Sequence, residues 1–354
     1  MKRLLPLLLL LSLALLLPGC GTCHRTASQL SLARELTAAY PYRPPALDRE
    51  TEDRILALNP DRVSAEDIRD VLSRAPAPRL INIRGGIFPV YLCMESFSDF
   101  VIGLGYPAAS VTNPATGNYS FSCYDNSERI AGAIVWYYER EGLRPVIVGH
   151  SQGGMQAVKV LYQLDSHRSK PLLVWNPLTA QPEPRTTITD PLTGTTIPAA
   201  PFQVPYVSSV AAGGFTRLMP NQWGMFGHLR KVPDSVEDFV GYSVPFDLFG
   251  GDLLGFGPMN RYAATGSAKV RNLQLPFGDN HVIVPVTKHL LKNPEVVAWI
   301  NAYVPSEPPP KEPSFKGDTR HLLWDADVWH GLKRHWVLEL QRTIRAQRAR
   351  QHEA

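Results

Sequence analysis

The sequence predicts an α/β fold with a mostly parallel central sheet and flanking helices. Short apolar runs, which are typical of buried strands, alternate with longer segments whose apolar residues recur at helical spacing. Residues 145–148 are such a run, and residues 155–164 are such a segment, with Met155, Val158 and Leu161 on one side. Because helices that connect parallel strands cover the faces of a sheet, this alternation favours one layered domain, and the hydrophobic fraction of 44% is enough for a sizeable core.

The other elements follow in the same manner. Residues 51–75 predict short helices, the second opened by Ser64 and Asp67 at the spacing of a capping box. A helix is expected from Asp125 to Gly142, because an aspartate can cap a helix start and a glycine commonly ends one. Strands are predicted at residues 79–83, 172–175, 239–249 and 270–275, a helix and a strand without clear bounds at 90–125, and a last helix from Asn293 and Pro294.

Two segments depart from this alternation. Residues 176–205 are rich in Pro, Thr and Gly and too long for an ordinary connection, so we expect a cap insertion over about 176–235. Residues 305–313 predict a stiff linker, and the basic tail from His330 is helix-prone. The tail helix either docks through its apolar residues or meets anionic lipid headgroups. The residues expected to line the cap are Phe215, Trp223, Met225 and Phe226, and those expected to dock the tail are Trp329, Leu332, Trp336 and Leu340.

The N-terminal residues predict export. A charged start is followed by a leucine run too short to span a bilayer, which is typical of a signal peptide over 1–19. Leu17-Pro18-Gly19-Cys20 resembles the lipobox of bacterial lipoproteins, although Pro18 is unusual there. This resemblance implies lipidation of Cys20 and a membrane anchor, with residues 20–50 as a tether; a plain signal peptide and secretion are the alternative.

Composition narrows the partners and the cofactors. A net charge of +4 argues against a nucleic-acid partner. No metal is expected, because no Cys/His spacing is typical of zinc, and no cofactor is expected, because no phosphate-binding loop is found. Export favours oxidation, so Cys93 and Cys123 are expected to form a disulfide worth about 3–4 kcal/mol, with two buried free thiols as the alternative. The oligomeric state is left open.

The stretch Gly149-His150-Ser151-Gln152-Gly153 carries the strongest functional signal. Chance alone would give roughly 0.1 matches to this pattern in a chain of this composition. Here it lies between a predicted strand and a predicted helix, which is the setting of a nucleophile elbow. The flanking glycines leave room for a tight turn that exposes the serine hydroxyl. We therefore expect Ser151 to be a nucleophile; the alternative is a serine that only caps the helix.

With this elbow the chain resembles an α/β-hydrolase of the lipase and esterase branch, over roughly residues 78–303. The resemblance implies a histidine base after the last strand, where His281 lies, and an acid at the end of the preceding strand. Asp252 is favoured because it follows a Gly-Gly turn and lies 29 residues before His281. Asp247 is the alternative acid, and a residue that caps the strand is the other interpretation of Asp247. The oxyanion donors implied are the backbone N–H of Gln152 and one from Gly86 or Ile87.

These residues predict a function. A Ser-His-Asp arrangement on this fold is typical of an enzyme that cleaves carboxylic esters through an acyl-enzyme. An acyltransferase or a thioesterase would use the same residues, since only the acceptor or the bond cleaved differs. A non-catalytic envelope lipoprotein that keeps the fold for binding is the alternative from a different class of protein.

Overall fold

A computed structural model describes residues 47–86, 88–114, 116–166, 170–213, 217–218, 220–250 and 261–353, together with Glu35 and Tyr40. The expected signal peptide, Cys20 and nearly all of the tether lie outside these residues. So do three predicted site or cap residues, which are Ile87, Phe215 and Asp252.

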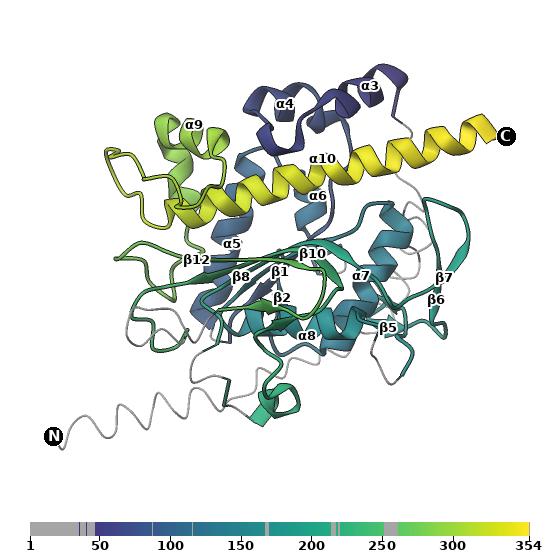
Figure 1. Ribbon diagram of the computed structural model, residues 1–354, viewed down its shortest axis with the longest axis horizontal. Helices are drawn as coiled ribbons and strands as arrows, with labels where there is room; N and C mark the ends of the chain where they lie inside the picture. Colours follow the sequence, from purple (N-terminus) through teal and green to yellow (C-terminus); the bar gives the residue numbers. More distant parts are fainter. Residues whose placement is uncertain are drawn as a thin grey trace.

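The described residues form an α/β fold around a six-stranded sheet in which every paired strand is parallel (Figure 1). The strand order is β12-β10-β8-β3-β1-β2. The sheet strands are β1 (Leu80–Arg84), β2 (Phe121–Ser122), β3 (Val146–His150), β8 (Val204–Val210), β10 (Val236–Ser243) and β12 (Lys269–Gln274). Shorter strands lie in three two-stranded pairs: β4 (Trp175–Asn176) with β5 (Gln181–Pro182), β6 (Thr187–Thr189) with β7 (Thr196–Pro198), and β9 (Lys231–Val232) with β11 (Ala263–Ala264).

The described helices pack on both faces of this sheet. They are α3 (Arg49–Ala57), α4 (Ala65–Asp70), α5 (Phe88–Gly103), α6 (Ala108–Val111), α7 (Ser127–Glu141), α8 (Gln152–Leu164), α9 (Pro294–Ala302) and α10 (Leu322–Glu353). Short 3-10 turns are η1 (Pro60–Arg62), η2 (Leu72–Arg74), η4 (Pro220–Met225) and η6 (Lys288–Lys292).

Alternate residues of each central strand enter two different cores. On one face, Val146 and Val148 of β3 join a core that includes residues of α5, α9 and α10. On the other face, Ile147 of β3 joins the core of α7 and α8. A strand buried on both faces reads as a continuous apolar run, and this explains why residues 145–148 were recognisable as a strand.

One strand prediction is wrong, and one strand of the sheet is missing from the predictions. Residues 172–175 do not form a sheet strand, because only Trp175 enters a strand, the two-residue β4, and Leu173 is 42% exposed. The strand beside β3 is instead β8, which lies inside the range assigned to the cap. Its two serines, Ser208 and Ser209, are fully buried. These polar residues interrupt the apolar run, so the pattern did not reveal a buried strand.

Several helix ends follow the expected chemistry. Ser64 and Asp67 form the capping box of α4. Gly142 ends α7 in the left-handed region, at φ 78°. The N-cap of α7 is Asn126 rather than Asp125, whose side chain instead accepts the N–H of Ser122 at 3.0 Å. Asn293 caps α9, and Pro294 is its first residue.

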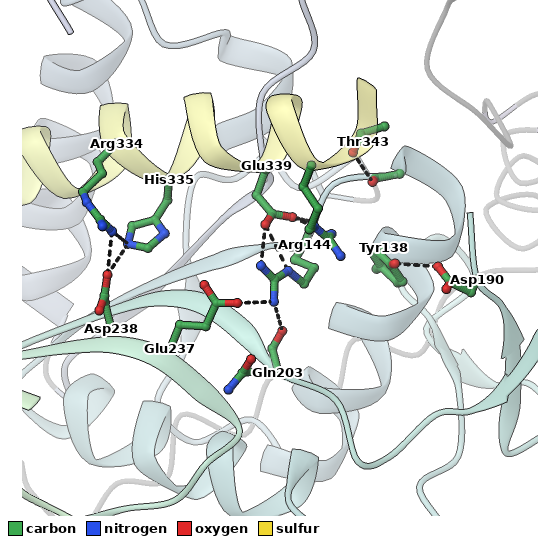
Figure 2. A network of polar contacts seen from close by, with 12 residues as sticks. Tyr138, Arg144, Asp190, Gln203, Glu237, Asp238, Arg334, His335, Glu339 and Thr343 are labelled. Atoms are coloured by element: carbon green, nitrogen blue, oxygen red, sulfur yellow. Dashed lines mark hydrogen bonds and ion pairs between the residues drawn. The ribbon is translucent and has the colours of Figure 1, made fainter. Parts of the chain in front are cut away.

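The tail prediction is confirmed as a docked helix. The helix α10 begins at Leu322, earlier than His330, and crosses the sheet on the side of α3, α4 and α9 (Figure 1). Its four predicted docking residues are each at most 2% exposed. Arg144, two residues before β3, points toward Glu339 of α10 and Glu237 of β10 (Figure 2). Its guanidinium lies 2.6 Å from Glu339 and 2.7 Å from Glu237. Among the residues described, no helix has the length and apolar character that crossing a membrane requires.

The predicted disulfide is not formed. Cys93 on α5 and Cys123 after β2 are both buried free thiols. Burial raises the pKa of Cys123 to about 12, so this thiol stays protonated. Its sulfur lies 3.5 Å from Oε1 of Gln152, and the thiol therefore contacts the elbow helix rather than a second cysteine.

Candidate active site

The turn between β3 and α8 has the strained geometry that the sequence predicts. Ser151 lies at φ 55° and ψ −124°, a backbone conformation that residues other than glycine rarely adopt and that costs about 1–3 kcal/mol. The surrounding strands support it, since its N–H donates to the carbonyl of Val210 in β8 at 2.9 Å. The Ser151 side chain makes no capping hydrogen bond to α8. The alternative of a simple helix cap is therefore wrong.

The three glycines around Ser151 each leave space that backbone or neighbouring side chains fill. A Cβ on Gly149 would lie 2.5 Å from the carbonyl oxygen of Gly153, and one on Gly153 would lie 2.0 Å from that of Ile83 in β1. A Cβ on Gly154 would meet the Ser209 hydroxyl of β8 at 2.3 Å. The glycine pattern thus follows from close packing of the elbow against both neighbouring strands.

His281 is brought to the serine as expected. Its Nε2 lies 2.9 Å from Oγ of Ser151, although the two residues are 130 positions apart. The histidine is in the loop after β12, and its side chain is 13% exposed. Since both residues follow carboxyl ends of parallel strands, the topology places them at the same edge of the sheet.

The acid partner in the structure is Asp247. Its Oδ2 lies 2.7 Å from Nδ1 of His281, and its side chain is 1% exposed. Its Oδ1 accepts the N–H of Gly250 at 2.7 Å. Asp252, the residue that the sequence favoured, lies outside the described residues, and the position of the acid beside His281 is occupied by the alternative.

The sequence does hold a signal for Asp247. A Cβ on Gly250 would lie 1.9 Å from Oδ2 of Asp247, so the glycine makes room for this carboxylate. Gly250 therefore makes room for the aspartate that precedes it. The spacing of an Asp and a Gly three residues later is visible in the sequence, whereas the contact between Gly250 and Asp247 is seen only in the structure.

The predicted oxyanion region is only partly described. Gln152 is the first residue of α8, where a backbone N–H has no partner within the helix. Gly86 lies beside it, because a Cβ on Gly86 would meet the Gln152 side chain at 2.9 Å. Tyr124 donates its hydroxyl to the carbonyl of Gly86 at 3.1 Å. The structure thus brings Gln152 and Gly86 together at the elbow, whereas Ile87 lies outside the described residues.

Exposed apolar side chains gather on the loops at this edge. The Phe249 ring centroid is 5.8 Å from that of His281, and those of Phe246 and Phe277 are 5.7 Å apart. Phe277 is 77% exposed. Of the residues expected to line a cap, Trp223 and Phe226 are exposed, and Met225 packs against a small core that includes Met155. The large exposed apolar residues that follow β8, β10 and β12 are Leu218, Trp223, Phe226, Phe246, Leu248, Phe249 and Phe277.

The polar groups at this edge are suited to nucleophilic catalysis. A histidine between a serine hydroxyl and a buried carboxylate can accept the hydroxyl proton while the carboxylate holds its tautomer. No cluster of His, Cys, Asp or Glu in the described part of the chain is arranged to hold a metal ion. No protein-family model matches the chain, and a search of curated proteins found no match.

Proposed function

We propose that this protein is a serine hydrolase of the α/β-hydrolase fold that cleaves carboxylic esters. The observation that carries the proposal is the contact between Ser151 Oγ and His281 Nε2 at 2.9 Å, with Asp247 on the other ring nitrogen. The strained backbone of Ser151 supports the same interpretation, because strain of this kind concentrates at functional sites. The acid of this proposal is Asp247 in place of Asp252.

The reaction would proceed in two steps. Ser151 Oγ attacks the ester carbonyl carbon while His281 Nε2 takes the hydroxyl proton, and the backbone N–H of Gln152 is placed to stabilise the oxyanion. His281 then gives this proton to the leaving alcohol as the C–O bond breaks, which leaves an acyl group on Ser151. Water then attacks the acyl carbon while His281 takes its proton, and His281 returns this proton to Ser151 Oγ as the bond between Oγ and the acyl carbon breaks and the carboxylic acid is released.

The exposed aromatic residues around the site favour an apolar ester as substrate. Side chains such as Phe249 and Phe277 would contact an acyl chain, whereas a charged substrate would gain nothing from them. An acyltransferase or thioesterase with the same three residues is the second candidate in the enzyme class, and a non-catalytic lipoprotein is the candidate outside it. No cofactor is needed for the proposed steps.

A panel of p-nitrophenyl esters of increasing acyl length tests the proposal. We expect turnover of the esters, with a preference for apolar chains. Transfer of the acyl group to an added alcohol would reveal an acyltransferase, and faster hydrolysis of added thioesters would reveal a thioesterase. A folded protein that turns over none of these substrates would favour the non-catalytic alternative.

We further propose that the chain is exported and held at a membrane through Cys20. The lipobox-like sequence at residues 17–20 supports this, and secretion without an anchor is the alternative. Cys20→Ser should release the protein from the membrane fraction or block its processing. A wild-type protein found wholly in the soluble fraction would contradict the anchor.

A further inference from the structure

His150 contacts the backbone of the residue proposed as the base. It is the last residue of β3, directly precedes Ser151 and is fully buried. Its Nε2 lies 2.6 Å from the carbonyl oxygen of His281. Since a carbonyl oxygen can only accept, Nε2 of His150 carries the proton and donates it to this bond.

Burial keeps His150 neutral. Burial in the sheet, with a smaller contribution from the nearby His281, lowers its pKa to about 3. The ring centroids of the two histidines are 5.5 Å apart. A charged His150 would therefore oppose the imidazolium that forms on His281 during the reaction, whereas a neutral one only donates its hydrogen bond.

We propose that His150 is a positioning residue that fixes the backbone of His281 to the strand that ends at Ser151. This inference rests on the proposed function, in which His281 is the base. His281 is then held on three sides, by Ser151 at Nε2, by Asp247 at Nδ1 and by His150 at its carbonyl oxygen. Because His150 and Ser151 are consecutive residues, the nucleophile and the base share one rigid frame.

A second contact holds the same loop from the other side. Asp279, two residues before His281, accepts the N–H of His321 at 3.1 Å, and its Oδ1 lies 2.9 Å from Nδ1 of that histidine. Both side chains are buried. The loop thus stays attached to the segment that begins α10 when His150 is changed. We therefore expect loss of the His150 contact to loosen the orientation of His281 without unfolding the chain.

Three variants separate the hydrogen bond from the packing of the side chain. In His150→Gln the side-chain amide nitrogen can reach about the place of Nε2, whereas in His150→Asn the amide nitrogen reaches only about the place of Nδ1. His150→Ala has no side-chain donor. Alanine and asparagine should lower kcat by about 10-fold to 100-fold with KM within about 2-fold, since a small misplacement of a reacting group is costly. Glutamine should restore most of the activity.

The matched control is His335→Ala. His335 is 1% exposed, and its Nε2 lies 3.0 Å from Asp238, so it is a comparably buried histidine on α10, far in the chain from the proposed catalytic residues. Its loss should lower the melting temperature and leave kcat per folded molecule unchanged. A His150→Ala variant that loses activity only in proportion to its folded fraction, as this control should, would overturn the proposal.

One further measurement distinguishes positioning from a merely structural role. The downfield NMR resonance of the His281 Nδ1 proton should persist in the wild type and His150→Gln and be lost or broadened in His150→Ala. If His150→Ala fails to fold, the comparison of Gln with Asn decides the matter.

The NMR measurement needs no turnover and therefore remains decisive if the proposed function fails. A wild type that neither hydrolyses esters nor reacts with a fluorophosphonate would defeat the proposed function alone. An unchanged Nδ1 resonance in His150→Ala, or a Gln variant as impaired as the Ala variant, would defeat the positioning role.

Discussion

Two clusters of buried polar side chains lie at different places in this molecule and are built differently. Beneath α10, Arg144 points toward Glu339 (Figure 2). Arg144 is 12% exposed and Glu339 is 1% exposed, and Glu339 also pairs with Arg342 at 2.8 Å. At the carboxyl edge of the sheet, Ser151, His281 and Asp247 form a chain that ends in a single hydroxyl on a strained residue. The first cluster is closed by ion pairs, whereas the second ends at the hydroxyl that we propose as the nucleophile.

This difference separates stability from activity. A closed network of ion pairs stabilises the folded state, and removing one partner leaves an uncompensated buried charge. The series of hydrogen bonds that ends at the strained Ser151 contributes little to the stability of the fold, because the surrounding strands maintain its geometry. Substitutions in the two clusters should therefore have opposite signatures.

The largest effect on turnover is expected from Ser151→Ala. Esterase activity should fall by at least about 10⁴-fold, because the acyl-enzyme cannot form. The melting temperature should stay within a few degrees of the wild type, since the side chain makes no helix cap. Steady-state kinetics beside thermal unfolding checks both halves, and retention of most of the activity would refute the nucleophile.

Asp247→Asn should lower kcat by about 100-fold or more while the protein stays folded. The asparagine oxygen can still accept the N–H of Gly250, but its amide would face Nδ1 of His281 and favour the wrong tautomer. Asp252→Asn is the matched control and should stay active. An inactive Asp252→Asn beside an active Asp247→Asn would return the role of the acid to Asp252.

In the other cluster, Glu339→Leu should lower the free energy of unfolding by about 3 kcal/mol, because Arg144 loses its most buried partner. Activity per folded molecule should be unchanged. The control is Asp70→Ala, which removes the exposed pair with Arg69 and should lower the free energy of unfolding much less, because solvent screens this pair. Equal costs for the two variants would contradict the contrast between the clusters.

Acid should weaken the cluster beneath α10. Hydrogen bonds and ion pairs from Arg144 outweigh burial and hold the pKa of Glu339 below its usual value of 4.5. Because the folded-state pKa is the lower one, this stabilisation is fully present above about pH 4.5 and is lost as the pH falls through the folded-state pKa. Denaturant titrations between pH 7 and pH 3 should therefore show that the free energy of unfolding falls less with acid in Glu339→Gln than in the wild type. The same dependence on pH in both proteins would refute the link between Glu339 and acid sensitivity.

The smallest effect concerns the two buried cysteines. If Cys93 and Cys123 are free thiols, a reductant should leave the melting temperature unchanged. Alkylation after denaturation, followed by peptide mapping, should find both sulfurs labelled without prior reduction. A peptide pair linked through these two residues would restore the predicted disulfide.

The sequence predicted the parts of the molecule that local chemistry determines. The elbow at Ser151 follows from glycine sterics, the capping box at Ser64 from hydrogen bonding, and the docking of α10 from apolar spacing. The family resemblance places a histidine after the last strand, and His281 lies there beside Ser151. The capping box depends on residues three positions apart, whereas the docking of α10 and the position of His281 involve contacts between residues that are distant in the chain.

The parts that were missed depend on tertiary contacts. The strand β8 was hidden because its buried polar residues, such as Ser208, break the apolar pattern. The choice between Asp247 and Asp252 depended on which carboxylate the chain turns toward His281, and the packing of Gly250 against Asp247 is not visible in a pattern of letters. The predicted pairing of Cys93 with Cys123 rests on the expectation of an oxidising compartment, which holds no information on where the elements that carry the two residues pack.

The reactivity of Ser151 tests the central claim most directly. The folded wild-type protein should react with a fluorophosphonate at a single site, with the adduct mapped by mass spectrometry to the peptide that contains Ser151. His281→Ala should slow the labelling strongly, because the hydroxyl loses its base. A folded wild-type protein that stays unlabelled, or one labelled at another residue, would contradict the account.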